Sequence, residues 1–216
     1  MRNLSLAFGI LLAIHIAGLL ANVPLAVTLT KPLLVPCLMV LVWLQSRTIR
    51  GHGIILAALF FSWLGDMLLM LPGEDFFMGG LAAFLSAHVC YIWIFSRGAA
   101  FRPLRVLPFL MYAALLLAGP LYGKLPENLQ IPVYSYVVVI TSMGIVASFR
   151  NAQQPGYELI LIGSILFILS DSFLALNKFS SPLPLSGLWV MLTYGLAQYF
   201  IVKGYLSVHS RQDQSV

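Results

Sequence analysis

Two aspartates lie inside apolar stretches that are long enough to cross a membrane. Asp66 follows Phe60–Gly65, and Asp171 follows Leu166–Ser170; further apolar residues come directly after each carboxylate. A carboxylate inside a bilayer costs several kcal/mol unless it faces water or protein, so such residues typically mark functional sites. Two carboxylates can divide acid–base work, because one can donate a proton while the other accepts a proton or stabilises a cation.

Other polar side chains in the apolar stretches have helical spacing. His88 belongs to a set that steps by four, three and four residues, namely Phe84, His88, Tyr91 and Phe95. His88 and Tyr91 are therefore expected on one helix face, and Tyr194 and Gln198 share a face at i and i+4. Tyr91, Tyr194 and Gln198 are also typical of the polar groups that hydrogen-bond neighbouring membrane helices together.

A purely structural interpretation of the aspartates pairs Asp66 with Lys31 and Asp171 with Lys178, which neutralises each buried charge. Two such costly residues near one histidine and one lysine favour a functional interpretation instead. His15 has no polar neighbour on its own helix, so we predict that it hydrogen-bonds another helix.

The composition defines the class of protein. Of 216 residues, 60% are hydrophobic and 9% charged, with a mean hydropathy of +0.94, whereas soluble domains carry about 25% charged residues. We predict an all-α polytopic transmembrane helix bundle, folded as one domain over 1–216. Spans of roughly 20 residues allow about eight helices, with seven as the alternative. The spans are expected near 4–21, 32–46, 53–71, 78–95, 104–122, 131–148, 158–176 and 185–207.

Lys and Arg concentrate on the cytoplasmic side of membrane proteins. With eight spans, three basic residues fall on one side: Lys31, Lys124 and Lys178. Nine fall on the other: Arg2, Arg47, Arg50, Arg97, Arg102, Arg105, Arg150, Lys203 and Arg211. Both termini are therefore predicted to be cytoplasmic. The net charge of +5 follows from this bias and requires no nucleic-acid partner.

The first span is predicted to remain as an uncleaved helix, because Leu19 occupies a position that should be small for cleavage after Ala21. Cys37 and Cys90 lie within spans and are expected to be packed thiols, with neither a disulfide framework nor a cysteine zinc site.

In this topology the third and seventh spans run outward, which places Asp66 and Asp171 at one depth. Each lies five residues before the expected end of its span, or roughly 7–8 Å below the outer boundary. Lys31, at the expected outer start of the second span, can reach the same level.

A set of short motifs extends from the second span to the last. These motifs are Thr30–Pro32, Phe61–Asp66, Ala83–Tyr91, Ser170–Phe179 and Tyr194–Gln198. With them the sequence resembles the YhhN family of eight-span membrane proteins, whose animal relatives are lysoplasmalogenases. The resemblance implies hydrolysis of the vinyl ether bond of a lysophospholipid to a fatty aldehyde and a glycerophospho-alcohol. It also implies a multi-pass protein of the bacterial cytoplasmic (inner) membrane.

This resemblance gives the polar residues expected roles. Asp66, Asp171 and His88 are the candidate catalytic residues, and the aspartates are expected to share one proton, so that one acts as acid and one as base. The sequence does not decide which is which. The candidate substrate-binding residues are Lys31, Tyr91, Asn177, Tyr194 and Gln198. We expect no cofactor and no metal, and membrane lipids as the surroundings. Phe61, Trp63, Phe84 and Tyr91 would admit an acyl chain sideways from the bilayer.

Three other functions remain open at this point. A transporter or proton-coupled channel would use the aspartates as a relay. A zinc-dependent lipid amidase of the ceramidase type would need about three ligands, of which only His88 is well placed. A structural or interaction protein would need a partner motif, and none is evident.

Overall fold

The computed structural model describes residues 2–45 and 52–210 and forms a bundle of eight α-helices without strands in that part of the chain. The helices are α1 (Arg2–Leu20), α2 (Pro24–Gln45), α3 (His52–Leu68), α4 (Glu74–Ser96), α5 (Leu107–Ala118), α6 (Glu127–Ser148), α7 (Tyr157–Ala175) and α8 (Ser186–Ser210). A 3₁₀ turn, η1 (Pro103–Arg105), precedes α5, and a π-helical segment, η2 (Leu176–Ser180), continues α7. The predicted all-α bundle is confirmed.

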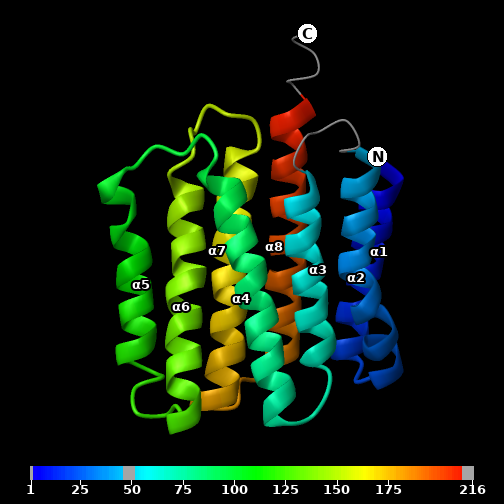
Figure 1. Ribbon diagram of the computed structural model, residues 1–216. Helices are drawn as coiled ribbons and strands as arrows, with labels where there is room; N and C mark the ends of the chain where they lie inside the picture. Colours follow the sequence, from blue (N-terminus) through cyan, green and yellow to red (C-terminus); the bar gives the residue numbers. More distant parts are fainter. Residues whose placement is uncertain (1, 46–51, 211–216) are drawn as a thin grey trace.

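The helices run side by side in alternating directions (Figure 1). The start of α1, the end of α8 and the α4–α5 and α6–α7 connections all lie at the upper end of that view. Five helices in the described ranges are long and apolar enough to cross a membrane, and α3 and η1–α5 are shorter apolar helices. The fold is therefore that of a multi-pass membrane protein. Arg47, Arg50 and Arg211 lie outside the described residues, and the side that faces the cytoplasm stays a prediction.

Helix α2 begins at Pro24, well before the expected start at 32, and it continues through Pro32 and Pro36. A helical carbonyl normally accepts from the N–H four residues later, but Pro36 has no N–H to offer the carbonyl of Pro32. The indole Nε1 of Trp63 on α3 donates to that carbonyl instead, at 3.1 Å. Because a partner helix satisfies the exposed group, the prolines do not end α2. Lys31 thus lies inside the helix rather than at its start.

The other helices begin and end within a few residues of the expected spans. Their most extensive contacts join α7 with α8 and α3 with α4, and small residues allow the close approach. A Cβ atom on Gly163 would lie 2.9 Å from the Ala197 carbonyl of α8. A Cβ atom on Gly65 would lie 2.6 Å from the ring of Phe84 on α4. Gly65 thereby brings its neighbour Asp66 against the bundle interior.

The face of α4 that carries Phe84, His88, Tyr91 and Phe95 points into the bundle, since all four residues are buried. Helix α5 is different: none of its residues is buried, and its main helix contact is with α6. It lies at one edge of the bundle beside α6 (Figure 1). A continuous core therefore surrounds the polar residues of α3, α4, α7 and α8, while α5 leaves space next to α7.

Candidate active site

Five of the eight predicted site residues line one cavity of about 300 Å³. Its walls come mainly from α1, α2, α3, α7 and α8. The predicted residues in this wall are Lys31, Asp66, Asp171, Asn177 and Tyr194. The two aspartates thus share a cavity, which their expected common depth made possible. We refer to this space as the polar cavity.

Asp66 is buried and has a partner on each carboxylate oxygen. The Tyr194 hydroxyl donates a hydrogen bond of 2.6 Å to Asp66 Oδ2. Lys31 Nζ lies 3.7 Å from Asp66 Oδ1. An ammonium group and a hydroxyl group from two other helices thus contact the carboxylate. Lys31 thus lies close to Asp66, as predicted. Through Tyr194, α8 also contacts this carboxylate, in addition to α2.

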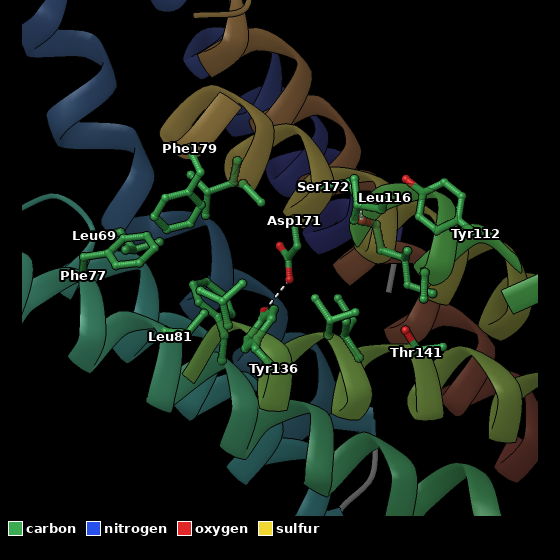
Figure 2. Close-up of a pocket in the computed structure, with 18 residues that line it drawn as sticks. Leu69, Phe77, Leu81, Tyr112, Leu116, Tyr136, Thr141, Asp171, Ser172 and Phe179 are labelled. Carbon is green, nitrogen blue, oxygen red and sulfur yellow. Dashed lines mark hydrogen bonds between the residues drawn. The ribbon is translucent and has the colours of Figure 1, made fainter. Parts of the chain in front are cut away.

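Asp171 lies in a chain of polar groups that reaches across α4, α6 and α7. The Tyr136 hydroxyl donates to Asp171 Oδ2, and His88 Nε2 lies 2.8 Å from the same hydroxyl and 3.5 Å from Asp171 Oδ2. A hydroxyl has one proton, so Tyr136 accepts from a protonated Nε2 of His88 while it donates to Asp171. Figure 2 shows the carboxylate of Asp171 directed at the Tyr136 hydroxyl.

The surroundings of the two carboxylates differ. The Asp66 side chain is 4% exposed and that of Asp171 is 15% exposed. Within the described part of the chain, Asp171 Oδ1 makes no hydrogen bond, and no hydrogen bond joins the two aspartates. Each aspartate instead accepts from a tyrosine of its own. One oxygen of Asp171 is therefore available to a molecule in the cavity, whereas both oxygens of Asp66 are engaged.

The structural interpretation that paired Asp171 with Lys178 is wrong. Lys178 lies in η2, and its Nζ is 4.8 Å from the centre of the Phe77 ring. The π-helical turn after α7 carries the lysine away from the carboxylate, and the ring face supplies a cation–π contact. His88 and Tyr136 take the place at Asp171 that Lys178 was expected to fill.

Tyr91, Gln198 and Asn177, which were predicted to bind substrate, make hydrogen bonds within the protein. Tyr91 donates a hydrogen bond of 2.6 Å to Gln198 Oε1, and neither residue lines the polar cavity. This bond ties α4 to α8. Asn177 lines the cavity, and its Oδ1 accepts from the Leu183 N–H at 3.0 Å.

His15 makes the predicted interhelical hydrogen bond, with its Nδ1 2.8 Å from Thr30 Oγ1. It also lines the polar cavity, which the sequence did not indicate. The Thr30 hydroxyl donates to the Ala26 carbonyl at 2.6 Å, so His15 Nδ1 must be the donor to Thr30. His15 Nε2 has no hydrogen-bond partner among the described residues.

Tyr136 is the main site residue that the sequence analysis missed. A usable signal exists, because four inward residues of α6 step by four, three and four: Leu129, Val133, Tyr136 and Ile140. A hydroxyl on an otherwise apolar inward stripe indicates a polar partner inside the bundle. Which partner it meets depends on the packing of α6 against α4 and α7, and the spacing alone does not define that packing.

Among the residues that the structure describes, no group of three or more His, Cys, Asp and Glu side chains is placed to hold a metal ion. Cys37 and Cys90 are free, partly buried thiols.

The site thus gathers two carboxylates with their own tyrosines, one lysine and one histidine inside a membrane helix bundle. Residues 26–205 match the YhhN family, and the chain belongs to that family. Human lysoplasmalogenase TMEM86B is 34% identical over 177 residues, which are 80% of this chain and 72% of that protein.

Two other relatives have the same activity in their names. Human lysoplasmalogenase TMEM86A is 33% identical over 201 residues, or 86% of this chain and 79% of that protein. A lysoplasmalogenase of Mycobacterium bovis is 31% identical over 168 residues, or 72% of this chain and 61% of that protein. No solved structure matches the chain at a significant level.

Proposed function

We propose that this protein is a lysoplasmalogenase, which hydrolyses the vinyl ether bond of a lysophospholipid to a fatty aldehyde and a glycerophospho-alcohol. The observation that carries this proposal is the polar cavity itself, in which one carboxylate is fixed by a cation and the other keeps an oxygen available. Relatives named lysoplasmalogenase from human and mycobacterial sources support the choice of substrate.

The chemistry requires a proton transfer in each of its three steps. A proton is added to the alkene carbon that is not bonded to oxygen, and the ether oxygen and its carbon then share the positive charge of an oxocarbenium ion. Water attacks that carbon and loses a proton to give a hemiacetal. The hemiacetal collapses to the aldehyde and the free alcohol, so the net reaction consumes one water. Glycoside cleavage, which passes through a similar cation, also uses two carboxyl groups.

Asp171 is the group that transfers the proton. Its Oδ1 is available to the cavity, while Oδ2 is held by Tyr136. After protonating the alkene, the carboxylate of Asp171 can take a proton from the attacking water, as a general base. The Tyr136 hydroxyl orients the carboxylate of Asp171 and links it to the imidazole of His88, whose Nε2 is 2.8 Å from that hydroxyl.

Asp66 stabilises the cation. Tyr194 and Lys31 hold this carboxylate in place, and a negative charge fixed in a cavity of low dielectric lowers the energy of a developing positive charge. Lys31 carries three donors, and its distance of 3.7 Å from Asp66 leaves donors for the phosphate of the substrate. Asn177 lies in the same wall and serves the polar end of the lipid.

The proposed location is the cytoplasmic membrane of a bacterium, with both termini in the cytoplasm. Four arginines belong to segments at the end of the bundle where α1 starts and α8 ends (Figure 1). Arg97, Arg102 and Arg105 lie in and near the α4–α5 connection, and Arg150 follows α6. The positive-inside rule assigns that end to the cytoplasm. The polar cavity would then open toward the outer half of the bilayer.

The test is product analysis with purified protein and three lysolipids that differ only in the chain linkage. Mass spectrometry should detect aldehyde from the vinyl ether, and no chain release from the ester or the saturated ether. Release of fatty acid from the ester, or no aldehyde at all, would overturn the proposal. Solute flux in liposomes without lipid turnover would favour the transporter function.

A further inference from the structure

A second, apolar space lies on the other side of Asp171 from the polar cavity. Figure 2 shows this pocket, with Phe77 and Phe179 at one end, Tyr112 and Thr141 at the other, and Asp171 between them. Its walls come from α4, α5, α6 and α7, and they are almost entirely hydrocarbon. We refer to this space as the apolar pocket. None of the predicted site residues except Asp171 lines it.

The two spaces share part of one wall. Leu69, Phe84, Asp171 and Leu174 line both the polar cavity and the apolar pocket. A molecule with a polar head and an apolar chain can therefore place one part on each side of Asp171. A carboxylate at such a boundary is positioned beside the bond that joins the head to the chain.

The apolar pocket is narrow, and a wider groove lies next to it. This groove, of about 550 Å³, runs between α5 and α7 and shares Tyr112 and Ile168 with the pocket. Arg105 also lines the groove, and its side chain hydrogen-bonds the Ser148 carbonyl and the Tyr157 hydroxyl. The groove exists because α5 contacts mainly α6 and leaves the adjoining face of α7 partly uncovered.

The apolar pocket and the groove together form a path that runs in the direction of a lipid chain in a membrane. From Asp171 to Leu161, which lines the groove, α7 rises by about 15 Å. The path therefore follows the helix axes rather than crossing the bundle. Chains of a lipid leaflet also run along the membrane normal, so a bound lysolipid would need no sharp bend in its chain.

We propose that the apolar pocket and the α5–α7 groove form the binding site for the hydrocarbon chain of the substrate, while the polar cavity holds its phosphate-bearing head. This inference rests on the proposed hydrolase function for the identity of the lipid. The narrow pocket beside Asp171 receives the alkenyl carbons and the first methylenes. The groove receives the rest of the chain. Of the four aromatic residues expected beside the chain, Phe84 lines the apolar pocket, whereas Phe61, Trp63 and Tyr91 do not.

The first test uses a matched pair of substitutions on α6. Val137 lines the apolar pocket, whereas the adjacent Val138 is 64% exposed on the outer face of the helix. Val137→Phe should lower kcat/KM for a long-chain lysoplasmalogen by about tenfold relative to a short-chain one. Val138→Phe should leave that ratio unchanged. An unchanged ratio in both variants, with active wild-type protein, would overturn the chain site and leave the hydrolase proposal standing.

The second test does not depend on turnover. A saturated-ether lysophosphatidylethanolamine with a photoreactive diazirine at the end of its chain should label peptides from η1–α5 and α7. Val137→Phe should reduce this labelling, and Val138→Phe should not. Labelling confined to α1, α2 and α8 would overturn the proposal. If the wild-type protein releases no aldehyde but the α5 and α7 labels appear, the hydrolase function fails and the chain site stands.

Discussion

The indole of Trp63 donates a hydrogen bond of 3.1 Å to the main-chain carbonyl of Pro32. This bond replaces the one that Pro36 cannot make, and it joins α2 to α3 at the level where Lys31 meets Asp66. A carbonyl without a donor is costly in a membrane interior, because no water is present to satisfy it. The contact therefore supports both the continuity of α2 and the position of Lys31.

Trp63→Phe should lower the free energy of unfolding by about 1–2 kcal/mol, since the Pro32 carbonyl loses its donor. Pro36→Ala restores a main-chain N–H that can bond this carbonyl, so the cost of Trp63→Phe should be smaller in the Pro36→Ala background. Equilibrium unfolding in mixed detergent micelles, followed by circular dichroism, measures both costs. The same cost in both backgrounds would mean that Trp63 acts through packing alone.

Lys31→Met should destabilise the fold more strongly, by roughly 3 kcal/mol, because it leaves the buried carboxylate of Asp66 without its cation. Adding Asp66→Asn removes the charge as well, and the double variant should regain most of the lost stability. The same unfolding assay measures this recovery. A double variant as unstable as the sum of the two single variants would contradict the pairing.

The helices and the relative positions of Asp66, Asp171 and Lys31 could largely be predicted from the sequence. Hydropathy defined the helices, and the positions of Asp66 and Asp171 near the ends of two spans placed them at a common depth. The reach of Lys31 to Asp66 followed from the same reasoning. These features depend on helix geometry and on distance along the chain, which sequence spacing records directly.

Other features depend on packing between distant helices. The second span was expected to start near 32, but α2 starts at Pro24. The helix continues through Pro32 and Pro36 because Trp63, on another helix, bonds the Pro32 carbonyl. Tyr136 became a site residue only through the contact of α6 with α4 and α7. The purely structural interpretation paired Lys178 with Asp171, but Lys178 lies in η2 over the ring of Phe77.

Asp171→Asn should reduce kcat for aldehyde release by about 10³-fold with little change in KM, because the variant cannot donate or accept the proton. Asp66→Asn should reduce kcat by about 10²-fold, because the cation loses a fixed negative charge. Aldehyde release by mass spectrometry measures both effects, with circular dichroism as a check of folding. Asp75→Asn, at an exposed position in the first turn of α4, is the control and should retain full activity. Near-normal turnover in both site variants would rule out the proposed roles.

Cysteine labelling should reveal the orientation of the bundle. In a Cys37→Ala, Cys90→Ala background, Arg102→Cys and Lys124→Cys each place a thiol at an exposed position at opposite ends of the bundle. In right-side-out spheroplasts, a membrane-impermeant maleimide should label Lys124→Cys directly and Arg102→Cys only after permeabilisation, because the basic end faces the cytoplasm. The reverse pattern would place the termini outside.

Tyr136→Phe should lower kcat by about 10–100-fold while KM stays close to the wild-type value, because Asp171 loses the donor that orients it. His88→Leu should have a similar effect, since His88 reaches the carboxylate through the same hydroxyl. If the two residues act as one chain, the double variant should be little slower than either single variant. Tyr134→Phe, on the exposed face of α6, is the matched control and should not change kcat. Multiplicative losses in the double variant would show that Tyr136 and His88 act on the reaction independently, and the orienting chain from His88 through Tyr136 to Asp171 would then have to be abandoned.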